Sequence, residues 1–333
     1  MTKHISIRPL RQAGFTLVEI MVGLAIGMLA TLVILQVMAM FEAQKRVTTG
    51  SADAQTNGSI ALYNIVREVS LAGYSLMPID DSPLECATLT FGTTGITSIT
   101  PVSLTDGTSD SITLSYGDSE MGGIPMTITG MGAPTANDAT VNNNLGCKTG
   151  DIALISNGST CALTTITDVS AASAVPPAII SLAETTTAIS DANLSCLGNW
   201  NEITFGVNGN NLTREGTAIM AGIVNMQAQY GVSASADSNQ VVQWVDPTGI
   251  WDTSVLTLAN RNRIKAIRIA VVARTDRLEA NDVTTAITSW ADSASSPAPA
   301  IDLSADANWK RYRYRVFETI VPLRNVIWAR DTL

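Results

Sequence analysis

Histidine is the residue most often used for catalysis near neutral pH, and this chain of 333 residues has only one, His4. It lies in a basic stretch, residues 1–14, ahead of a long apolar segment. If that stretch is removed, Ser-His-Asp and Cys-His mechanisms and histidine-containing zinc or iron sites are excluded. Catalysis by a pair of carboxylates is not excluded, because acidic residues are scattered along the chain. A Ser-Lys mechanism is disfavoured because lysines are few. We expect no enzyme, no metal site and no cofactor.

The cysteines are the other residues capable of covalent chemistry: Cys86, Cys147, Cys161 and Cys196. All four follow the apolar segment. An even number of cysteines in an oxidising compartment predicts two disulfides, and three pairings are possible. Because Cys147 and Cys161 flank an expected hairpin, we favour Cys147–Cys161 with Cys86–Cys196. Four zinc-bound thiolates are a rival reading, although no C-x-x-C pair occurs, and free thiols are another.

Two weaker patterns suggest ligands. Asp106 and Asp110 place two acids in one turn, as a calcium site would, but calcium takes about 6–8 oxygen ligands.

Between Arg311 and Val316, arginines alternate with tyrosine and valine, which could bind single-stranded nucleic acid. A half-buried strand gives the same alternation. The acidic net charge of −9 also disfavours a general nucleic-acid surface, so we favour the structural reading.

The apolar segment is long enough to cross a membrane. Ile20–Phe41 has no charged side chain, and about 20 apolar residues span a bilayer as a helix. Lys3, Arg8 and Arg11 precede it, which keeps the N-terminus in the cytoplasm and places the rest of the chain beyond the inner membrane. A secretory signal peptide is the main rival, but its apolar core is about 7–15 residues with a small-residue cleavage site after it. This segment is longer, and no clean site follows.

The junction between the basic stretch and the apolar segment reads GFTLVE, residues 14–19. This motif resembles the processing site of type IV prepilins and of type II secretion pseudopilins. The resemblance implies that a prepilin peptidase cuts between Gly14 and Phe15, and that Phe15 becomes an N-methylated terminus while the helix is retained. Loss of the leader would remove Lys3, Arg8 and Arg11 and change the net charge from −9 to about −12.

Polar and small residues inside the apolar helix need a reason. A carboxylate such as Glu19 costs up to about 2.5–3.5 kcal/mol in a membrane helix and should have a partner. The resemblance implies that the partner is the amine of Phe15 on a neighbouring subunit, and the alternative is an acid that reaches the headgroups. Gly23 and Gly27 have the small-xxx-small spacing that lets helices approach closely, although glycine is common in membrane helices anyway.

The pattern after the membrane segment predicts how the chain is organised. An amphipathic stripe indicates that the helix continues along a head domain and ends near Ala72–Gly73. Thr48–Ser59 has poor helix propensity, so the helix is expected either to continue through this stretch or to be interrupted there. We expect a leader (1–14), a membrane half of the helix (15–41), an amphipathic half (42–73) and a β-rich head (74–333). The stripe comprises Leu62, Ile65, Val66, Val69 and Gly73.

The head reads as strands and turns, so the predicted fold class is α+β, with a long N-terminal helix packed on an antiparallel sheet. Met131–Gly150 and Thr284–Asn308 are predicted as long surface loops. The predicted strands are Ser111–Tyr116, Asp151–Ser156, Ala162–Thr167, Glu202–Val207, Val241–Val245, Arg263–Ala273 and Arg311–Val316.

A finer resemblance covers both ends and one middle segment. Val18–Leu29, Ser59–Tyr74, Asn225–Val232 and Tyr312–Trp328 are similar to PilW-type minor pilins. The resemblance implies a non-catalytic subunit that primes type IV pilus assembly and ends in a tip complex. Twitching motility, adhesion and DNA uptake are alternative roles of such a pilus. Its implied partners are other minor pilins, the major pilin, prepilin peptidase, the inner-membrane assembly platform and a PilY-type tip adhesin.

One departure and two alternatives go with this resemblance. Major pilins usually have a proline inside the helix, whereas none occurs here between Pro9 and Pro78. That difference favours a minor subunit. The alternatives are a J-type tip pseudopilin of type II secretion, and a tip subunit that contacts a surface or DNA.

Overall fold

The computed structural model divides the chain into two units, Met1–Ala52 and Asp53–Leu333. Of the expected leader only Gly14 is described, and the C-terminal residues after Val326 also lie outside the described part. The structure describes residues 14–76, 86–92, 94–96, 98–131, 137–170, 178–184, 192–290, 293 and 296–326.

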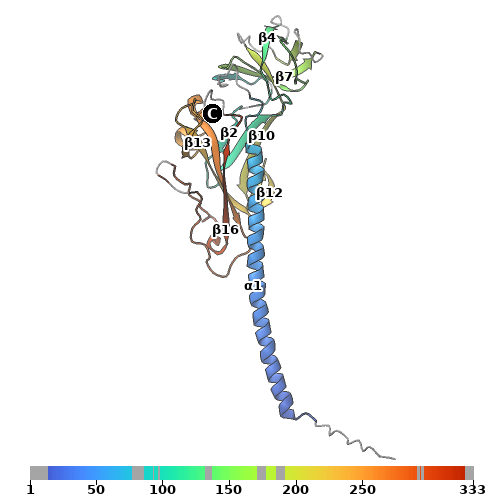
Figure 1. The fold of residues 1–333 in the computed structure, drawn as a ribbon, viewed down its shortest axis with the longest axis vertical. Helices are drawn as coiled ribbons and strands as arrows, with labels where there is room; N and C mark the ends of the chain where they lie inside the picture. Colours follow the sequence, from blue (N-terminus) through green and yellow to red (C-terminus); the bar gives the residue numbers. More distant parts are fainter. Residues whose placement is uncertain are drawn as a thin grey trace, which may run out of the picture. The chain divides into compact units, whose positions relative to one another are not determined.

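One helix, α1 (Leu17–Val69), runs through 53 residues without interruption (Figure 1). The stretch with poor propensity is therefore helical. The predicted stripe is confirmed, because Ile65 and Val69 are buried and Leu62 and Val66 pack against the same core. The helix ends slightly earlier than predicted, at Val69. Turns then lead to Gly73, whose φ of +75° is a conformation that suits glycine.

A five-stranded antiparallel sheet has the order β12-β11-β10-β3-β2. Apolar residues at alternate positions of its strands, such as Ile112 and Leu114, point into the core. Its strands are β2 (Val102–Thr105), β3 (Ser111–Gly117), β10 (Trp200–Asn208), β11 (Asn211–Arg214) and β12 (Thr217–Ala221).

A four-stranded antiparallel sheet has the order β14-β13-β15-β16. Its central strands are buried on both faces. One face of β15, including Ile267 and Ile269, points into the core, and Arg268 lies on the other face. The strands are β13 (Ile223–Ser233), β14 (Val241–Val245), β15 (Ile264–Arg274) and β16 (Tyr314–Pro322).

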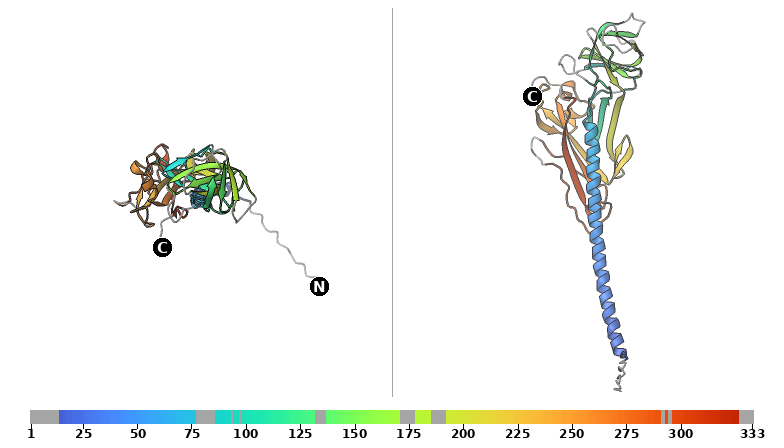
Figure 2. Two further views of the ribbon diagram at one scale, coloured as in Figure 1. Left: turned by 90° about the horizontal axis from the view of Figure 1, so that it is seen from above. Right: turned by 45° about the vertical axis from the view of Figure 1, so that its right-hand side comes forward.

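These two sheets share one hydrophobic core with the end of α1 (Figure 2). Ala54, Ala61 and Ile65 of the helix lie in the same cluster as Phe205 and Tyr230 of the sheets. Burial of apolar surface contributes about 25 cal/mol per Å² to such a core. The predicted α+β class is therefore confirmed, with the helix packed on antiparallel sheets.

The third sheet was not foreseen: it closes into a six-stranded barrel, β7-β6-β9-β4-β5-β8, because β8 also pairs with β7. Bulges at Ile128/Gly130 and Ile166/Asp168 let β4 and β7 bend from one neighbour to the next. β1 (Thr88–Thr90) adds to β7 in parallel. The barrel strands are β4 (Met126–Met131), β5 (Asp138–Val141), β6 (Ile152–Ser156), β7 (Thr160–Val169), β8 (Ala178–Leu182) and β9 (Asn193–Gly198).

The barrel is an insertion into the five-stranded sheet. β3 and β10 are paired neighbours, yet residues 118–199 lie between them in sequence and contain all six barrel strands. The barrel has its own core, to which every one of its strands contributes. It is therefore an added module on the helix-and-sheet scaffold.

The two disulfides are Cys86–Cys161 and Cys147–Cys196. The favoured pairing of Cys147 with Cys161 was wrong, although β6 and β7 do form the hairpin between them. Cys161 packs outside the barrel wall against Leu76 and Leu163. Cys147 and Cys196 lie in the barrel core. The wall of the barrel separates the two pairs, which sequence spacing did not reveal.

Most predicted strands are confirmed, including those that became β3, β6, β7, β10, β14 and β15. Two predictions need correction. The expected loop Met131–Gly150 contains β5, whose alternating small apolar residues Ala139 and Val141 face the barrel core. Arg311–Val316 is not one strand, because a 3-10 turn occupies Trp309–Arg311 and β16 begins at Tyr314.

Candidate functional site

The processing segment forms a helix cap at the start of α1. The backbone N–H and the hydroxyl of Thr16 each donate to Oε2 of Glu19 at 2.9 Å. The N–H of Glu19 donates in return to Thr16 Oγ1 at 3.3 Å. Thr16 is the N-cap residue and Glu19 the third residue of the helix, so this is a capping box. The T-x-x-E part of the motif thus fixes where the helix begins.

The residues before the helix cap, Gly14 and Phe15, are exposed to solvent. Phe15 is 84% exposed, Gly14 is exposed and not helical, and no atom lies within 4 Å of where a Cβ would sit on Gly14. A peptidase needs an accessible bond, and the exposed Gly14–Phe15 bond offers one. Cleavage there would free the amine of Phe15. That amine would lie two bonds from the Phe15–Thr16 peptide, whose N–H donates to Glu19.

The helix that follows exposes its apolar side chains. Among the described residues, α1 is the one helix long and apolar enough to cross a membrane. Its side chains from Phe15 to Phe41 are exposed, and no atom lies within 4 Å of an ideal Cβ on Gly23 or Gly27. Such a surface is unfavourable in water and needs lipid or other helices. The two glycines are therefore available for helix contacts, as their predicted role requires.

The other end of α1 is tied to the head by a buried carboxylate, Glu68. Its side chain is 6% exposed, and its two oxygens have separate partners. Tyr116 Oη on β3 donates to Oε2 at 2.9 Å, and Oε1 pairs with Arg67 at 3.1 Å and Arg214 at 3.5 Å. Burial, together with the Glu68 carboxylate, raises the pKa of Tyr116 to about 12. The tyrosine thus stays a donor, and the helix end is held on the sheet.

Two further contacts hold the helix against the four-stranded sheet. An added Cβ on Gly58 would lie 2.2 Å from Cε2 of Phe317, so the glycine allows the ring to pack on the helix backbone. Asn325 Nδ2, just after β16, donates to the carbonyls of Ser70 and Ala72 at 3.3 and 3.2 Å. These donors satisfy carbonyl groups that the end of a helix leaves unpaired.

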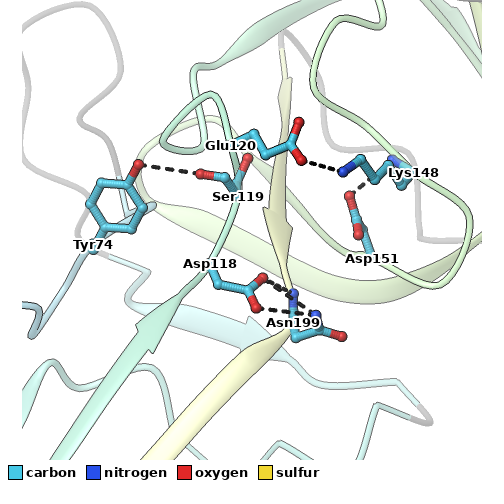
Figure 3. A network of polar contacts seen from close by, with 7 residues as sticks. All are labelled: Tyr74, Asp118, Ser119, Glu120, Lys148, Asp151 and Asn199. Atoms are coloured by element: carbon cyan, nitrogen blue, oxygen red, sulfur yellow. Dashed lines mark hydrogen bonds and ion pairs between the residues drawn. The ribbon is translucent and has the colours of Figure 1, made fainter.

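The barrel is joined to the scaffold by a polar clasp (Figure 3). Asp118 Oδ1 accepts from the N–H of Asn199 at 2.6 Å, and Oδ2 accepts from its side-chain amide at 3.1 Å. Tyr74 Oη donates to the carbonyl of Ser119 at 3.2 Å. A Cβ on Gly198 would lie 2.3 Å from Asp118 Oδ1, and its φ is +74°. The two chain segments entering and leaving the barrel are thus held to each other.

Lys148 extends this clasp along the barrel. Its Nζ pairs with Glu120 at 2.5 Å, and its N–H donates to Asp151 at 2.9 Å (Figure 3). The hydrogen bond with Glu120 raises the pKa of Lys148, and burial raises that of Asp151. Both Lys148 and Glu120 are mostly exposed, so solvent screens this ion pair and it contributes little to stability.

Two family models match the chain. The prokaryotic N-terminal methylation motif matches residues 9–35, and type IV pilus-assembly protein W, PilW, matches residues 190–325. The first match covers the capped, exposed start of α1, and the second covers β10–β16 of the scaffold.

The chain is prepilin-like, and its residues 190–325 match the PilW family.

The resemblance seen in the sequence is thereby confirmed. Pilin-family domains are structural rather than enzymatic, and they work together with other pilus components. No curated protein and no solved structure matches the chain. Strands β4–β8 of the barrel lie outside both matched segments.

One of the two acids considered for calcium, Asp110, has a structural role in the head. Asp110 is buried, and its carboxylate accepts from the N–H groups of Gly107 at 3.1 Å and of Ala228 at 2.8 Å. It therefore joins the β2–β3 turn to β13. Burial raises its pKa to about 7. Within the described residues, no three His, Cys, Asp or Glu side chains are grouped as a metal site would need.

The arginines considered for nucleic acid contact the protein's own chain. Arg311 Nε donates to the carbonyl of Glu279 at 2.8 Å, and Arg313 Nε donates to its carboxylate at 2.8 Å. Arg315 is exposed on β16. These contacts join the start of the β15–β16 connection, at Glu279, to its end, at Arg311 and Arg313. They favour the structural interpretation of the alternating pattern.

Sequence reasoning missed Arg268, on the outer face of β15. Its guanidinium lies 5.2 Å from the ring centre of Trp244 and 4.2 Å from that of Trp290, and its Nε donates to Gln229 Oε1 at 2.7 Å. Burial lowers its pKa to about 10. The available signal was an arginine between Ile267 and Ile269 in the middle of a largely apolar strand, since a buried charge needs partners.

Proposed function

We propose that this pilin-like protein is a minor pilin that primes assembly of a type IV pilus and takes a place in a tip complex with other minor pilins. The observation that carries the proposal is that one chain combines the methylation motif at residues 9–35 with the PilW match at residues 190–325. Its role is structural and needs no catalysis by this subunit. The apolar helix enters the filament, and the head contacts neighbouring subunits.

The proposed maturation begins at the exposed Gly14–Phe15 peptide bond, just before the helix cap. Prepilin peptidase cuts between Gly14 and Phe15, and the Phe15 amine is methylated. Until assembly, the bonds from Thr16 satisfy the Glu19 carboxylate within its own helix. During assembly, a neighbouring amine supplies the opposite charge that a carboxylate in hydrocarbon requires. Gly23 and Gly27 lie further along the helix, where packed helices would meet.

The proposed location follows from the same segments. Residues 15–41 span the inner membrane before assembly, residues 42–73 carry the helix out of it, and the head (74–333) lies in the periplasm. The major pilin, the assembly platform and other minor pilins are the proposed partners. A PilY-type adhesin is a further one.

The inserted barrel supports a position at the tip. Residues 118–199 add a closed module that lies largely outside the PilW match. A head enlarged in this way would obstruct its neighbours if repeated along a filament, whereas one copy at the end would not. The barrel also leaves a pilin-type scaffold free to contact the subunits below it.

The first test is the mass and the N-terminal residue of the protein from its host membrane, with and without prepilin peptidase. We expect a methylated Phe15 terminus that is lost in the peptidase mutant. An intact Met1 in both strains, or a terminus beyond Phe41, would refute the proposal.

The second test counts surface pili after deletion of the gene and after complementation. We expect few pili in the deletion strain, recovery with the unaltered gene, and poor recovery with Glu19→Ala. Glu42→Ala is the matched control, because Glu42 is a carboxylate on the same helix that forms an exposed pair with Arg46 at 3.5 Å. Normal pili with a defect in protein secretion would identify a J-type pseudopilin instead.

A further inference from the structure

The disulfides of the head are interleaved along the chain. In sequence order, the first cysteine pairs with the third and the second with the fourth, because the bonds are Cys86–Cys161 and Cys147–Cys196. The separations are 75 and 49 residues. Cys147 and Cys161, which do not pair, are the closest in sequence, 14 residues apart.

An unfolded chain would form the wrong bond first. Closing a loop becomes harder as about the 3/2 power of its length. By this measure Cys147 meets Cys161 about 7-fold more readily than it meets Cys196, and Cys161 meets Cys147 about 12-fold more readily than Cys86. Cys196 is also exported last, so Cys147 and Cys161 are both present before the native partner of Cys147 arrives.

The wrong bond is incompatible with the folded barrel. Along β6, Ala153 and Ile155 point into the barrel core, while Leu154 points to the outer cluster. Cys147 lies with the first group and Cys161 with the second. A Cys147–Cys161 bond would have to pass through the wall that β6 helps to form, so the chain cannot close the barrel until that bond breaks.

We propose that the head reaches its native disulfides through a periplasmic thiol–disulfide isomerase, which is therefore a required partner in the biogenesis of this protein. The inference rests on the proposed export of the head to an oxidising compartment. Uncatalysed rearrangement of disulfides takes minutes to hours, and the folded barrel shields Cys161 completely. The exchange must therefore occur before the barrel closes.

The exchange conserves electrons. Starting from Cys147–Cys161 and Cys86–Cys196, the isomerase thiolate attacks Cys147 Sγ, forms a mixed disulfide and releases the Cys161 thiolate. That thiolate attacks Cys86 Sγ, forms Cys86–Cys161 and releases the Cys196 thiolate. The Cys196 thiolate then attacks Cys147 Sγ and releases the isomerase thiolate. Two disulfides are present before and after, so no oxidant or reductant is consumed.

The test maps the disulfides of the full-length chain from host cells with and without the isomerase. Thiols are trapped by alkylation, and the chain is digested without reduction. Cleavage at acidic residues is needed, since no lysine or arginine lies between Cys86 and Cys147 or between Cys161 and Cys196. Without isomerase, we expect Cys147–Cys161 to exceed Cys147–Cys196 by about 7-fold, as the loop lengths imply. With isomerase, we expect the native pairs.

Two double variants serve as matched controls. The Cys86→Ser/Cys161→Ser variant and the Cys147→Ser/Cys196→Ser variant each retain one native pair and have no wrong partner. Each should form its bond equally with and without isomerase, and a dependence in either variant would contradict mispairing as the cause.

The outcomes separate this inference from the proposed function. Native pairs in unchanged proportion without isomerase would overturn the inference alone. Four free thiols in both strains would show that the head is not exported, which would overturn the proposed function together with the inference.

Discussion

Gly58 provides the sharpest test of how the head holds its helix. In Gly58→Ala, the new methyl would lie 2.2 Å from Cε2 and 2.4 Å from Cδ2 of Phe317. Carbon atoms in contact are about 3.5–4.0 Å apart. Phe317 packs against the shared core, so its ring cannot turn away without disturbing other side chains.

Two effects of opposite sign compete in this variant. Alanine is better than glycine inside a helix by about 1 kcal/mol. Overpacking a core costs about 1–3 kcal/mol, and the short distances place this site at the upper end. We expect a net loss of about 1–2 kcal/mol, which corresponds to a melting temperature lower by about 2–8 °C for a domain of this size.

The assay is thermal unfolding of the full-length protein in detergent. Gly27→Ala is the matched control, because it is the same change in the same helix with no atom near the new methyl. Phe317→Leu combined with Gly58→Ala should recover part of the loss, since leucine lacks the outer ring atoms. A melting temperature that rises in Gly58→Ala would refute the reasoning, because propensity alone would then control the site.

Substitutions at three further positions test the polar contacts of the head. In Arg268→Lys, loss of the planar fork that holds Gln229 should lower the free energy of unfolding, measured in urea, by about 1.5–3 kcal/mol, as for a hydrogen bond to a charged group. An unchanged value would contradict the role of the stacked arginine. Because burial raises the folded-state pKa of Asp110 to about 7 from 3.8, the folded chain holds a proton that the unfolded chain has released between these values. Its stabilising contribution is therefore complete below about pH 4 and is lost by about pH 7, by at most about 1.4 kcal/mol per pH unit. Asp110→Asn should reduce the fall in urea midpoint between pH 5 and pH 7, and an equal fall would exclude Asp110 as its source. Glu68→Ala leaves the Tyr116 hydroxyl without its acceptor and should cost about 1–3 kcal/mol, whereas Glu68→Gln, which keeps an oxygen there, should cost less.

The sequence by itself determined the N-terminal part of this protein. GFTLVE holds the capping residues Thr16 and Glu19 within one turn. The apolar run is continuous along the chain, and the stripe that includes Ile65 and Val69 repeats with the helix period. These signals involve residues a few positions apart. Strand positions such as β3 and β15 were predictable for the same reason, since an apolar or β-branched run is a local property.

The tertiary structure decided the features that join distant residues. It paired Cys86 with Cys161 across 75 residues, closed the barrel through β7 and β8, and set Glu68 against Tyr116. It also kept the helix intact at Gly58, where propensity is poor but Phe317 packs. Spacing along the chain favours cysteine pairs that close the shortest loops. The folded protein selects the cysteine pairs that lie on the same side of the barrel strands. Those pairs depend on all strands being in place at once, which no local pattern encodes.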